Sequence, residues 1–219
     1  MFGQDNNHFY YLGKEVAVMA KLLCLLGLPG AGKSTVLYRL YEEHPNDLIF
    51  VPRVTDRSVR PDELSPERNP EYNFVSQSWF EALTRTNCFV AVELFNGYAY
   101  GVRKSDLEVV FSNHRPGIMM PGYCAIDIKK QYPEQTLLAF LSVPGIDYEN
   151  CVILPKGEQC LRARMTKRGD DSDKLETRIQ LARQIIEKDR LHLQADHILV
   201  KDDEGGSDAI AAIKNLLGI

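Results

Sequence analysis

The chain has 219 residues, of which 44% are hydrophobic and 26% charged, so it can bury an ordinary core and is unlike a disordered protein. Its formal net charge of -4 excludes a general attraction to nucleic acid or anionic membranes, so any phosphate binding must come from local arginine clusters. The five cysteines form no C-x-x-C pair, which is typical of reduced thiols in the cytoplasm.

The first predicted elements surround a glycine-rich loop. Residues 1–20 have no clear period and are taken as an N-terminal extension. Residues 22–26 form an apolar run of buried-strand type, and residues 34–43 have helical spacing of apolar side chains. The apolar stretch 16–28 is interrupted by Lys21 and runs into the glycine loop, so we expect neither a signal peptide nor a membrane span, and a soluble, cytoplasmic protein.

The middle of the chain predicts a small α+β insertion. Residues 48–51 indicate a strand, and residues 56–69 an open loop rich in arginine, proline and acidic residues. Three short alternating runs then flank a helix that contains Trp79, Phe80 and Leu83. These runs are residues 72–75, 89–94 and 98–102.

The second half alternates predicted strands and helices, which implies a parallel sheet. The predicted strands are residues 123–128, 151–154 and 197–200, and Asp127 lies at the end of the first. The predicted helices are residues 133–141, 174–193 and 208–217. Together with the first half, this order predicts an α/β protein of the P-loop type, with three layers (α/β/α) around a parallel central sheet, a small insertion and a short lid that carries arginines.

The glycine loop matches the phosphate-binding motif G-x-x-x-x-G-K-[ST] between a strand and a helix, which is the context that the motif requires. Glycines let backbone N–H groups point at phosphate oxygens, and the helix N-terminus adds a favourable dipole. Lys33 is then expected to reach the β- and γ-phosphates and the Ser34 hydroxyl to bind Mg²⁺, with ATP as the nucleotide. The predicted ATP-binding residues are Gly27, Pro29, Gly30, Ala31, Gly32, Lys33, Ser34 and Thr35.

Around this loop, the sequence resembles guanylate kinases from residue 21 to residue 217. Residues 55–63 are similar to that family's T-T-R-x-x-R-x-G-E segment and residues 72–76 to its Y-x-F-V-S strand. Residues 95–101 resemble its F-x-G-N-Y-Y-G turn, and residues 152–169 its strand, turn and R-L-x-x-R-G lid.

The resemblance implies roles for the residues at these positions. Arg57, Arg60, Tyr72 and Tyr100 would hold the acceptor's phosphate, a task that suits guanidinium forks and phenol hydroxyls. Arg164, Arg168 and Arg178 would be lid arginines that stabilise charge on the migrating phosphoryl group and exclude water. Arg162 and Arg183 are equally well explained as a solvated helix face. The predicted catalytic residues are Lys33, Arg57, Arg164, Arg168 and Arg178.

Asp127 aligns with the first aspartate of the family's D-I-D sequence. The resemblance places it at the acceptor and near magnesium, which it would hold through water. A helix-capping or core-edge aspartate is the alternative. The second aspartate is Lys129 here, and Arg53 replaces a small serine, so both would bring positive charge near the pocket.

The carboxylate that would bind guanine is also missing from the position where the family has it. Guanine offers N1–H and an N2 amine together, donors that a glutamate accepts in the family, whereas the aligned residue here is Ala91. Glu93 lies two residues further on and faces the same way in a strand, so it is the predicted replacement.

The predicted organisation follows from these assignments. It consists of an N-terminal extension (1–20), a P-loop core (21–56, 103–160 and 179–219), an acceptor-binding insertion (57–102) and a lid (161–178). The leading functional prediction is ATP-dependent phosphorylation of GMP or dGMP by a monomer or homodimer that binds neither nucleic acid nor membrane. A kinase of the same build acting on another nucleotide or a sugar phosphate is the alternative. A binding module without phosphotransfer is disfavoured by the intact loop and arginines.

Overall fold

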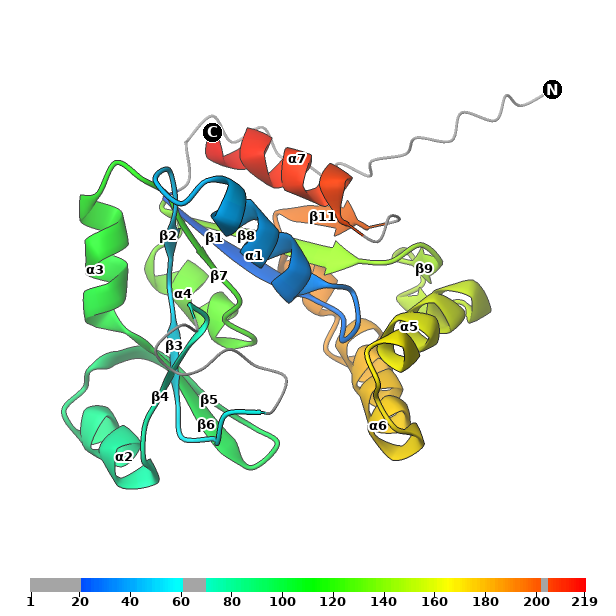
Figure 1. Cartoon of the computed structure of the whole chain (residues 1–219), viewed down its shortest axis with the longest axis horizontal. Coiled ribbons are helices and arrows are strands. Elements are labelled where there is room, and N and C mark those ends of the chain that lie inside the picture. The colour runs from blue at the N-terminus through cyan, green and yellow to red at the C-terminus, as the bar shows by residue number, and fades with distance from the viewer. Residues whose placement is uncertain (1–20, 61–69, 202–204) are drawn as a thin grey trace.

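The computed structural model of the chain describes residues 21–60, 70–201 and 205–219, so the predicted extension 1–20 and most of the charged loop 56–69 lie outside the described residues. The central sheet has five parallel strands in the order β11-β8-β1-β7-β2 (Figure 1). Their bounds are β1 (Leu22–Gly27), β2 (Ile49–Phe50), β7 (Gly117–Met119), β8 (Thr136–Ser142) and β11 (His197–Val200).

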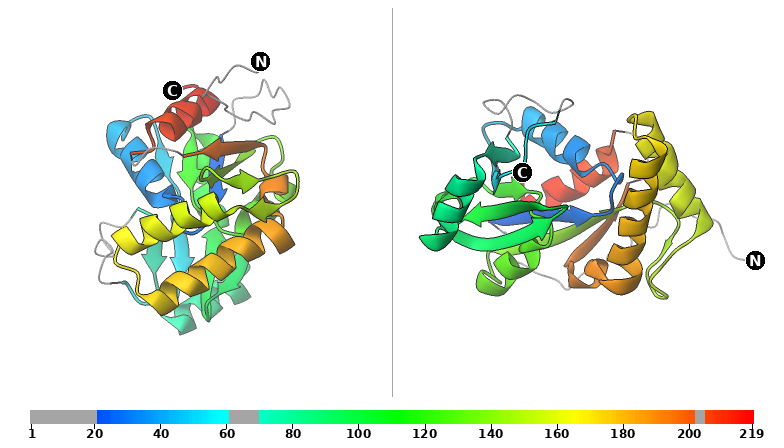
Figure 2. Two further views of the ribbon diagram at one scale, coloured as in Figure 1. Left: turned by 90° about the vertical axis from the view of Figure 1, so that its right-hand side faces the viewer. Right: turned by 90° about the horizontal axis from the view of Figure 1, so that it is seen from below.

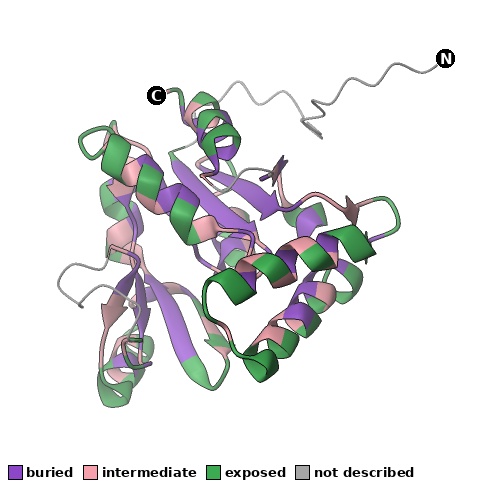
Figure 3. Cartoon of the chain, turned by 45° about the vertical axis from the view of Figure 1, so that its right-hand side comes forward, coloured by how far each residue is buried: buried purple, intermediate pink, exposed green. Residues whose placement is uncertain are grey.

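Helices cover both faces of this sheet, as expected for parallel strands that are buried on two sides. Helix α1 (Lys33–Glu43) and helix α7 (Ser207–Leu217) pack together on one face, and α4 (Cys124–Gln131) packs on β8 from the other (Figure 2). The buried residues gather in and beside the central strands (Figure 3). The predicted three-layer fold with a parallel sheet is confirmed.

Two predicted elements in the second half are wrong. The predicted strand 123–128 is helix α4, whose buried residues Cys124, Ala125 and Ile128 have helical spacing. The predicted helix 133–141 is strand β8, in which every residue is buried. A short apolar run of this kind can be a buried strand or a buried helix segment, because periodicity alone does not separate them.

Other parts of the chain also differ from the prediction. Residues 151–154 do not join the central sheet, because β10 (Val152–Ile153) pairs antiparallel with β9 (Ile146–Asp147) outside it. Helix α3 (Lys104–Ser112) and strand β7 were not predicted.

A second, four-stranded sheet has the order β4-β3-β6-β5. It contains β3 (Arg53–Thr55), β4 (Tyr72–Phe74), β5 (Phe89–Phe95) and β6 (Tyr98–Arg103). Helix α2 (Gln77–Arg85) covers it through a small core of its own, in which Phe80 stacks on Phe89 at 4.8 Å between ring centroids. The three runs predicted as strands and the helix between them are confirmed.

Helices α5 (Pro155–Lys167) and α6 (Ser172–Arg183) stand side by side and project from the sheet near the glycine loop (Figure 1). Helix α6 continues into a π-helical turn, Gln184–Lys188, and the chain then forms a 3₁₀ turn, Leu191–Gln194, so the predicted helix 174–193 has three parts. No helix among the described residues has the length and apolarity to cross a membrane.

Candidate active site

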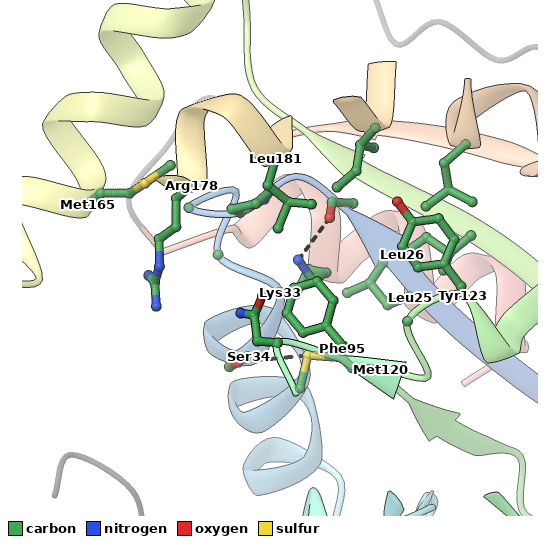
Figure 4. A pocket seen from close by; sticks show the side chains of 18 of the residues that line it. Leu25, Leu26, Lys33, Ser34, Phe95, Met120, Tyr123, Met165, Arg178 and Leu181 are labelled. Atoms are coloured by element: carbon green, nitrogen blue, oxygen red, sulfur yellow. Dashed lines mark hydrogen bonds between the residues drawn. The ribbon is translucent and has the colours of Figure 1, made fainter. Parts of the chain in front are cut away.

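The glycine loop, the small sheet and the two projecting helices enclose one cavity of about 1160 Å³. Figure 4 shows Lys33, Ser34 and Met120 beside the loop, and Arg178 and Met165 on the projecting helices. The volume exceeds the roughly 300–1,000 Å³ usual for one small ligand, so a donor and an acceptor can lie in it together.

Backbone geometry explains the glycines of the loop. Gly30 and Gly32 adopt φ of +77° and +94°, the left-handed region that glycine enters without a steric penalty. A Cβ on Gly27 would lie 2.1 Å from the carbonyl oxygen of Leu141, which leaves no room for any other residue. Helix α1 begins directly after Gly32, so its N-terminal N–H groups face the cavity.

Lys33 curls back over this loop. Its Nζ donates hydrogen bonds to the carbonyl oxygens of Gly27 at 2.9 Å and Leu28 at 3.1 Å. Burial lowers the pKa of Lys33 to about 8, and the neighbouring charge of Glu71 partly opposes this shift. The ammonium group is therefore held at the loop, where a bound polyphosphate would favour its charged form.

The donor set offered to magnesium is small. Ser34 is exposed to the cavity, but its Oγ lies 3.8 Å from Sδ of Met120, which follows the end of β7 beside β1. A thioether is a poor ligand for Mg²⁺, which prefers carboxylate, carbonyl and water oxygens. No cluster of three potential metal ligands occurs among the described residues. The Ser34 hydroxyl fits a magnesium ion that is held mainly by nucleotide phosphates and water.

Asp127 does not supply a carboxylate here. It lies on the exposed side of α4, pairs with Lys130 at 3.5 Å and does not line the cavity. Lys129 lies outside the cavity as well, because its Nζ bonds to the carbonyl oxygen of Thr136 and to Asp196. The structure thus gives no support to a metal or acceptor role for Asp127, since that interpretation depended on a strand that is a helix.

Aromatic rings and arginines form the wall opposite the glycine loop. Tyr72 and Tyr100 both line the cavity, and the guanidinium of Arg53 lies 5.0 Å from the centroid of each ring. Arg57 packs 4.5 Å from the Tyr72 centroid and is buried behind it, whereas Arg60 lines the cavity. Of the predicted phosphate-binding residues, three therefore face the cavity and Arg57 supports one of them.

Arg53 is the centre of a buried ionic network. Its Nη1 lies 3.2 Å from a carboxylate oxygen of Glu93, and its Nη2 3.5 Å from Glu71 and within hydrogen-bond distance of the Tyr72 hydroxyl. Both carboxylates and Arg53 are nearly closed off from water. Burial alone would lower the pKa of Arg53, but the neighbouring Tyr72, Glu71 and Glu93 outweigh it and raise that pKa, so the guanidinium stays charged.

Glu93, the predicted guanine reader, is already engaged. Besides Arg53, its carboxylate accepts a hydrogen bond of 3.1 Å from the backbone N–H of Cys124 at the start of α4. A Cβ on Gly122 would lie 2.2 Å from its Oε1, so the surrounding backbone closes tightly around it. Burial raises the pKa of Glu93, and Arg53 and the backbone N–H groups oppose that shift.

The three predicted lid arginines divide between two places. Arg164 reaches the glycine loop, where it donates to the carbonyl oxygen of Ala31 at 3.3 Å and to that of Lys201 at 2.9 Å. Arg168 and Arg178 line the cavity and share the carboxylate of Asp170. The sequence places them ten positions apart, and only the turn between α5 and α6 brings them together.

Arg162 and Arg183 form ion pairs, as expected for the solvated helix face that explained them equally well, although Arg183 also lines the cavity. Arg162 pairs with Glu158 and Glu176, each at 2.8 Å, and Arg183 pairs with Glu158 at 2.6 Å. Several other cavity residues were not predicted as site residues, either because no motif contains them or, for Phe95 and Asn96, because the turn that contains them suggested only Tyr100. They include Glu71, Phe95, Asn96, Met120, Tyr123 and Lys201.

A glycine loop at the carboxyl end of a parallel sheet, open to a cavity lined by arginines, is the arrangement of a P-loop phosphotransferase. The profile of the guanylate kinase family matches residues 19–217, so the chain belongs to that family. Its relatives include a guanylate kinase of Porphyromonas gingivalis, 31% identical over 156 residues that cover 70% of this chain and 75% of that protein.

Two further similarities extend over nearly the whole chain. A guanylate kinase of Chlorobium luteolum is 25% identical over 211 residues, which cover 94% of this chain and 97% of that protein. The crystal structure of guanylate kinase from Anaplasma phagocytophilum has a TM-score of 0.64 at 19% identity, and covers 92% of this chain and 86% of that one. The similarity to the Anaplasma phagocytophilum structure shows a shared fold.

Proposed function

We propose that the protein transfers the γ-phosphoryl group of ATP to the phosphate of GMP or dGMP and releases the nucleoside diphosphate. The observation that carries this proposal is the single cavity that joins the glycine loop to Arg60, Tyr72 and the lid arginines. The acceptor binds to the predicted insertion, residues 57–102, together with strand β3, which begins at Arg53. Residues 161–178 act as the lid, and residues 21–56, 103–160 and 179–219 as the core.

The chain's own groups act by positioning and electrostatics, without a covalent intermediate. The loop amides and Lys33 hold the β- and γ-phosphates, while Arg168 and Arg178 stabilise charge on the transferred group. Tyr72, Tyr100 and Arg60 hold the acceptor phosphate, with Arg57 fixing the Tyr72 ring from behind.

Magnesium belongs to this proposal through the nucleotide. The Ser34 hydroxyl is the protein group placed to bind it, and the ion, when bound, neutralises charge on the β- and γ-phosphate oxygens. We also place the enzyme in the cytoplasm, which the five free cysteines support. A monomer or homodimer remains the predicted state.

One observation favours a second candidate, a kinase of the same kind whose acceptor is not a guanine nucleotide. Ala91 has no carboxylate, and the Glu93 oxygens already pair with Arg53 and the Cys124 N–H. These bonds weaken Glu93 as an acceptor for the two donors of guanine, and each buried donor left unpaired costs about 1–3 kcal/mol. A different nucleotide or a phosphorylated sugar avoids that cost.

Steady-state turnover separates the two candidates. The purified protein is incubated with ATP and Mg²⁺ against GMP, dGMP, AMP, CMP, UMP and pentose phosphates, with ADP release followed for each and Lys33→Ala as the blank. Turnover with GMP or dGMP at least tenfold above the other acceptors supports the first candidate. Silence on guanine nucleotides with turnover on another acceptor supports the second, and silence on the whole panel contradicts both.

A further inference from the structure

The turn between α5 and α6 contains an acidic side chain that the proposed chemistry has not used. Asp170 lies in a connecting turn, yet its side chain is only 2% exposed. Three cations surround it: Nη2 of Arg168 at 2.9 Å, Nη1 of Arg178 at 2.7 Å and Nζ of Lys174 at 3.3 Å. The Asp170 carboxylate is therefore buried and contacts three cations of the predicted lid.

Both arginines meet the same oxygen, Oδ2, while Lys174 meets Oδ1. Two guanidinium groups held this close repel each other, and a carboxylate between them compensates that repulsion through charge-assisted hydrogen bonds. Each guanidinium has five N–H donors, so one bond to Asp170 leaves most of the fork for phosphate oxygens. Arg168 and Arg178 both line the cavity.

The backbone fixes Asp170 relative to α5. Its N–H donates to the carbonyl oxygen of Met165 at 3.2 Å, and Gly169 before it has φ of +87°, a conformation suited to glycine. The next residue, Asp171, has a different task, because its Oδ1 caps α6 by accepting from the backbone N–H of Lys174 at 2.8 Å. Of these two adjacent aspartates, Asp171 therefore caps α6 and Asp170 contacts the arginines.

We propose that Asp170 is a positioning residue that presents Arg168 and Arg178 as a pair to the transferred phosphoryl group. The inference rests on the proposed phosphotransfer but not on the identity of the acceptor. Asp170 acts through the arginines and does not touch the substrate. Removal of its charge leaves two cations without their common partner, so they separate and lose the shared orientation.

The test compares Asp170→Asn with Asp173→Asn. Asp173 is an exposed acidic residue in the first turn of α6 and forms no ion pair with an arginine among the described residues, so its substitution removes the same charge from the same lid. We expect Asp170→Asn to lower kcat by about tenfold, the usual scale for a residue that orients a direct ligand, with the Kd for ATP within twofold. Asp173→Asn should match the wild type.

A second readout does not need the acceptor. ADP with aluminium fluoride mimics the phosphoryl group in transfer, and its Kd relative to that of ADP alone should weaken about tenfold in Asp170→Asn. In the Arg178→Ala background, Asp170→Asn should add less than twofold, because the pair is already broken.

Equal losses of ADP and ADP–aluminium fluoride affinity, an unchanged kcat, or full additivity with Arg178→Ala would overturn the proposal. If Asp170→Asn does not fold, variants of the two arginines test the proposal without it. Arg168→Ala with Arg178→Ala should then lose no more than either single variant, and independent, multiplying losses contradict a pair. A wild type that turns over no acceptor but binds ADP–aluminium fluoride tightly refutes the proposed function and leaves Asp170 testable.

Discussion

The donor side and the acceptor side of the cavity are built in opposite ways. One contiguous segment, Gly27 to Thr35, shapes the donor side almost alone, through backbone N–H groups and Lys33 bonded to its own loop. On the acceptor side, Arg53 pairs with Glu93, which lies 40 positions away in the chain, and with Glu71 on the adjoining strand segment. A motif can encode the first arrangement, whereas the second exists only after three strands have come together.

This difference has a functional meaning. The donor side uses groups that every residue has, so its chemistry needs glycines and one lysine at fixed spacing. The acceptor side uses the charge balance of side chains, in which Arg53 pairs with the carboxylates of both Glu71 and Glu93. We therefore expect substitutions on the donor side to affect turnover, and those on the acceptor side to affect stability and acceptor choice.

The largest effect should come from Lys33→Ala. The substitution removes the cation that reaches the β- and γ-phosphates, and kcat/KM should fall by about 10³-fold. Among the described residues, the hydrogen bonds of Lys33 go to the loop carbonyls of Gly27 and Leu28, so the thermal midpoint should change little. Steady-state kinetics and calorimetry check this. A loss of less than tenfold would mean that the donor side does not depend on its motif.

Arg53→Ala should act on the acceptor side. It leaves the buried carboxylates of Glu71 and Glu93 without their shared cation, so the free energy of unfolding should fall by about 3 kcal/mol in urea titrations. The double variant Arg53→Ala/Glu93→Gln should recover about half of that loss, because it removes one uncompensated charge. The KM for the acceptor should rise while the Kd for ATP stays unchanged. An unaltered acceptor KM would deny Arg53 a place in acceptor choice.

The pH dependence of ATP binding should show a smaller effect. Burial holds the pKa of Lys33 at about 8 in the ligand-free protein, and bound phosphates raise it because they favour the ammonium form. Binding above pH 8 therefore needs proton uptake, and the Kd for ATP should rise roughly five- to tenfold between pH 7.5 and 9. The same shift makes the unfolding free energy rise from pH 8 toward the unfolded pKa, because there the unfolded chain binds more protons.

Isothermal titration at several pH values measures this dependence. Lys33→Ala is the matched control, since it should bind weakly with a Kd that is nearly flat over the same range. A wild-type Kd that does not change with pH would place the Lys33 pKa well above 9.

The smallest effect should belong to Asp127→Asn. The side chain is exposed and, among the described residues, forms an ion pair only with Lys130, so stability should change by less than about 0.5 kcal/mol and kcat should stay within twofold. The dependence of turnover on Mg²⁺ concentration should also be unchanged. A tenfold rise in the Mg²⁺ concentration needed for half-maximal rate would restore a metal role to this residue.

Parts of the fold could be predicted because their signals are local. The glycine loop, its strand and helix, and the alternating strands of the small sheet follow from residue type and spacing. Strand β8 and helix α4 were exchanged in type, because β8 is buried on both faces and has no alternation, whereas α4 is too short for its helical spacing to stand out in the sequence. The interpretation of Asp127 assumed that it ends a strand, whereas the structure places it on the exposed side of α4.

By itself, the sequence determined the phosphate-binding loop and the family, because these depend on contiguous residues with fixed spacing. It also contained the arginines, but not their partners. Only the tertiary structure decided that Glu93 belongs to Arg53, that Met120 and not an acid faces Ser34, and that Asp170 joins Arg168 to Arg178. The physical reason is that charge pairing depends on distances in space, and those are set when the two sheets and the lid helices pack around the cavity.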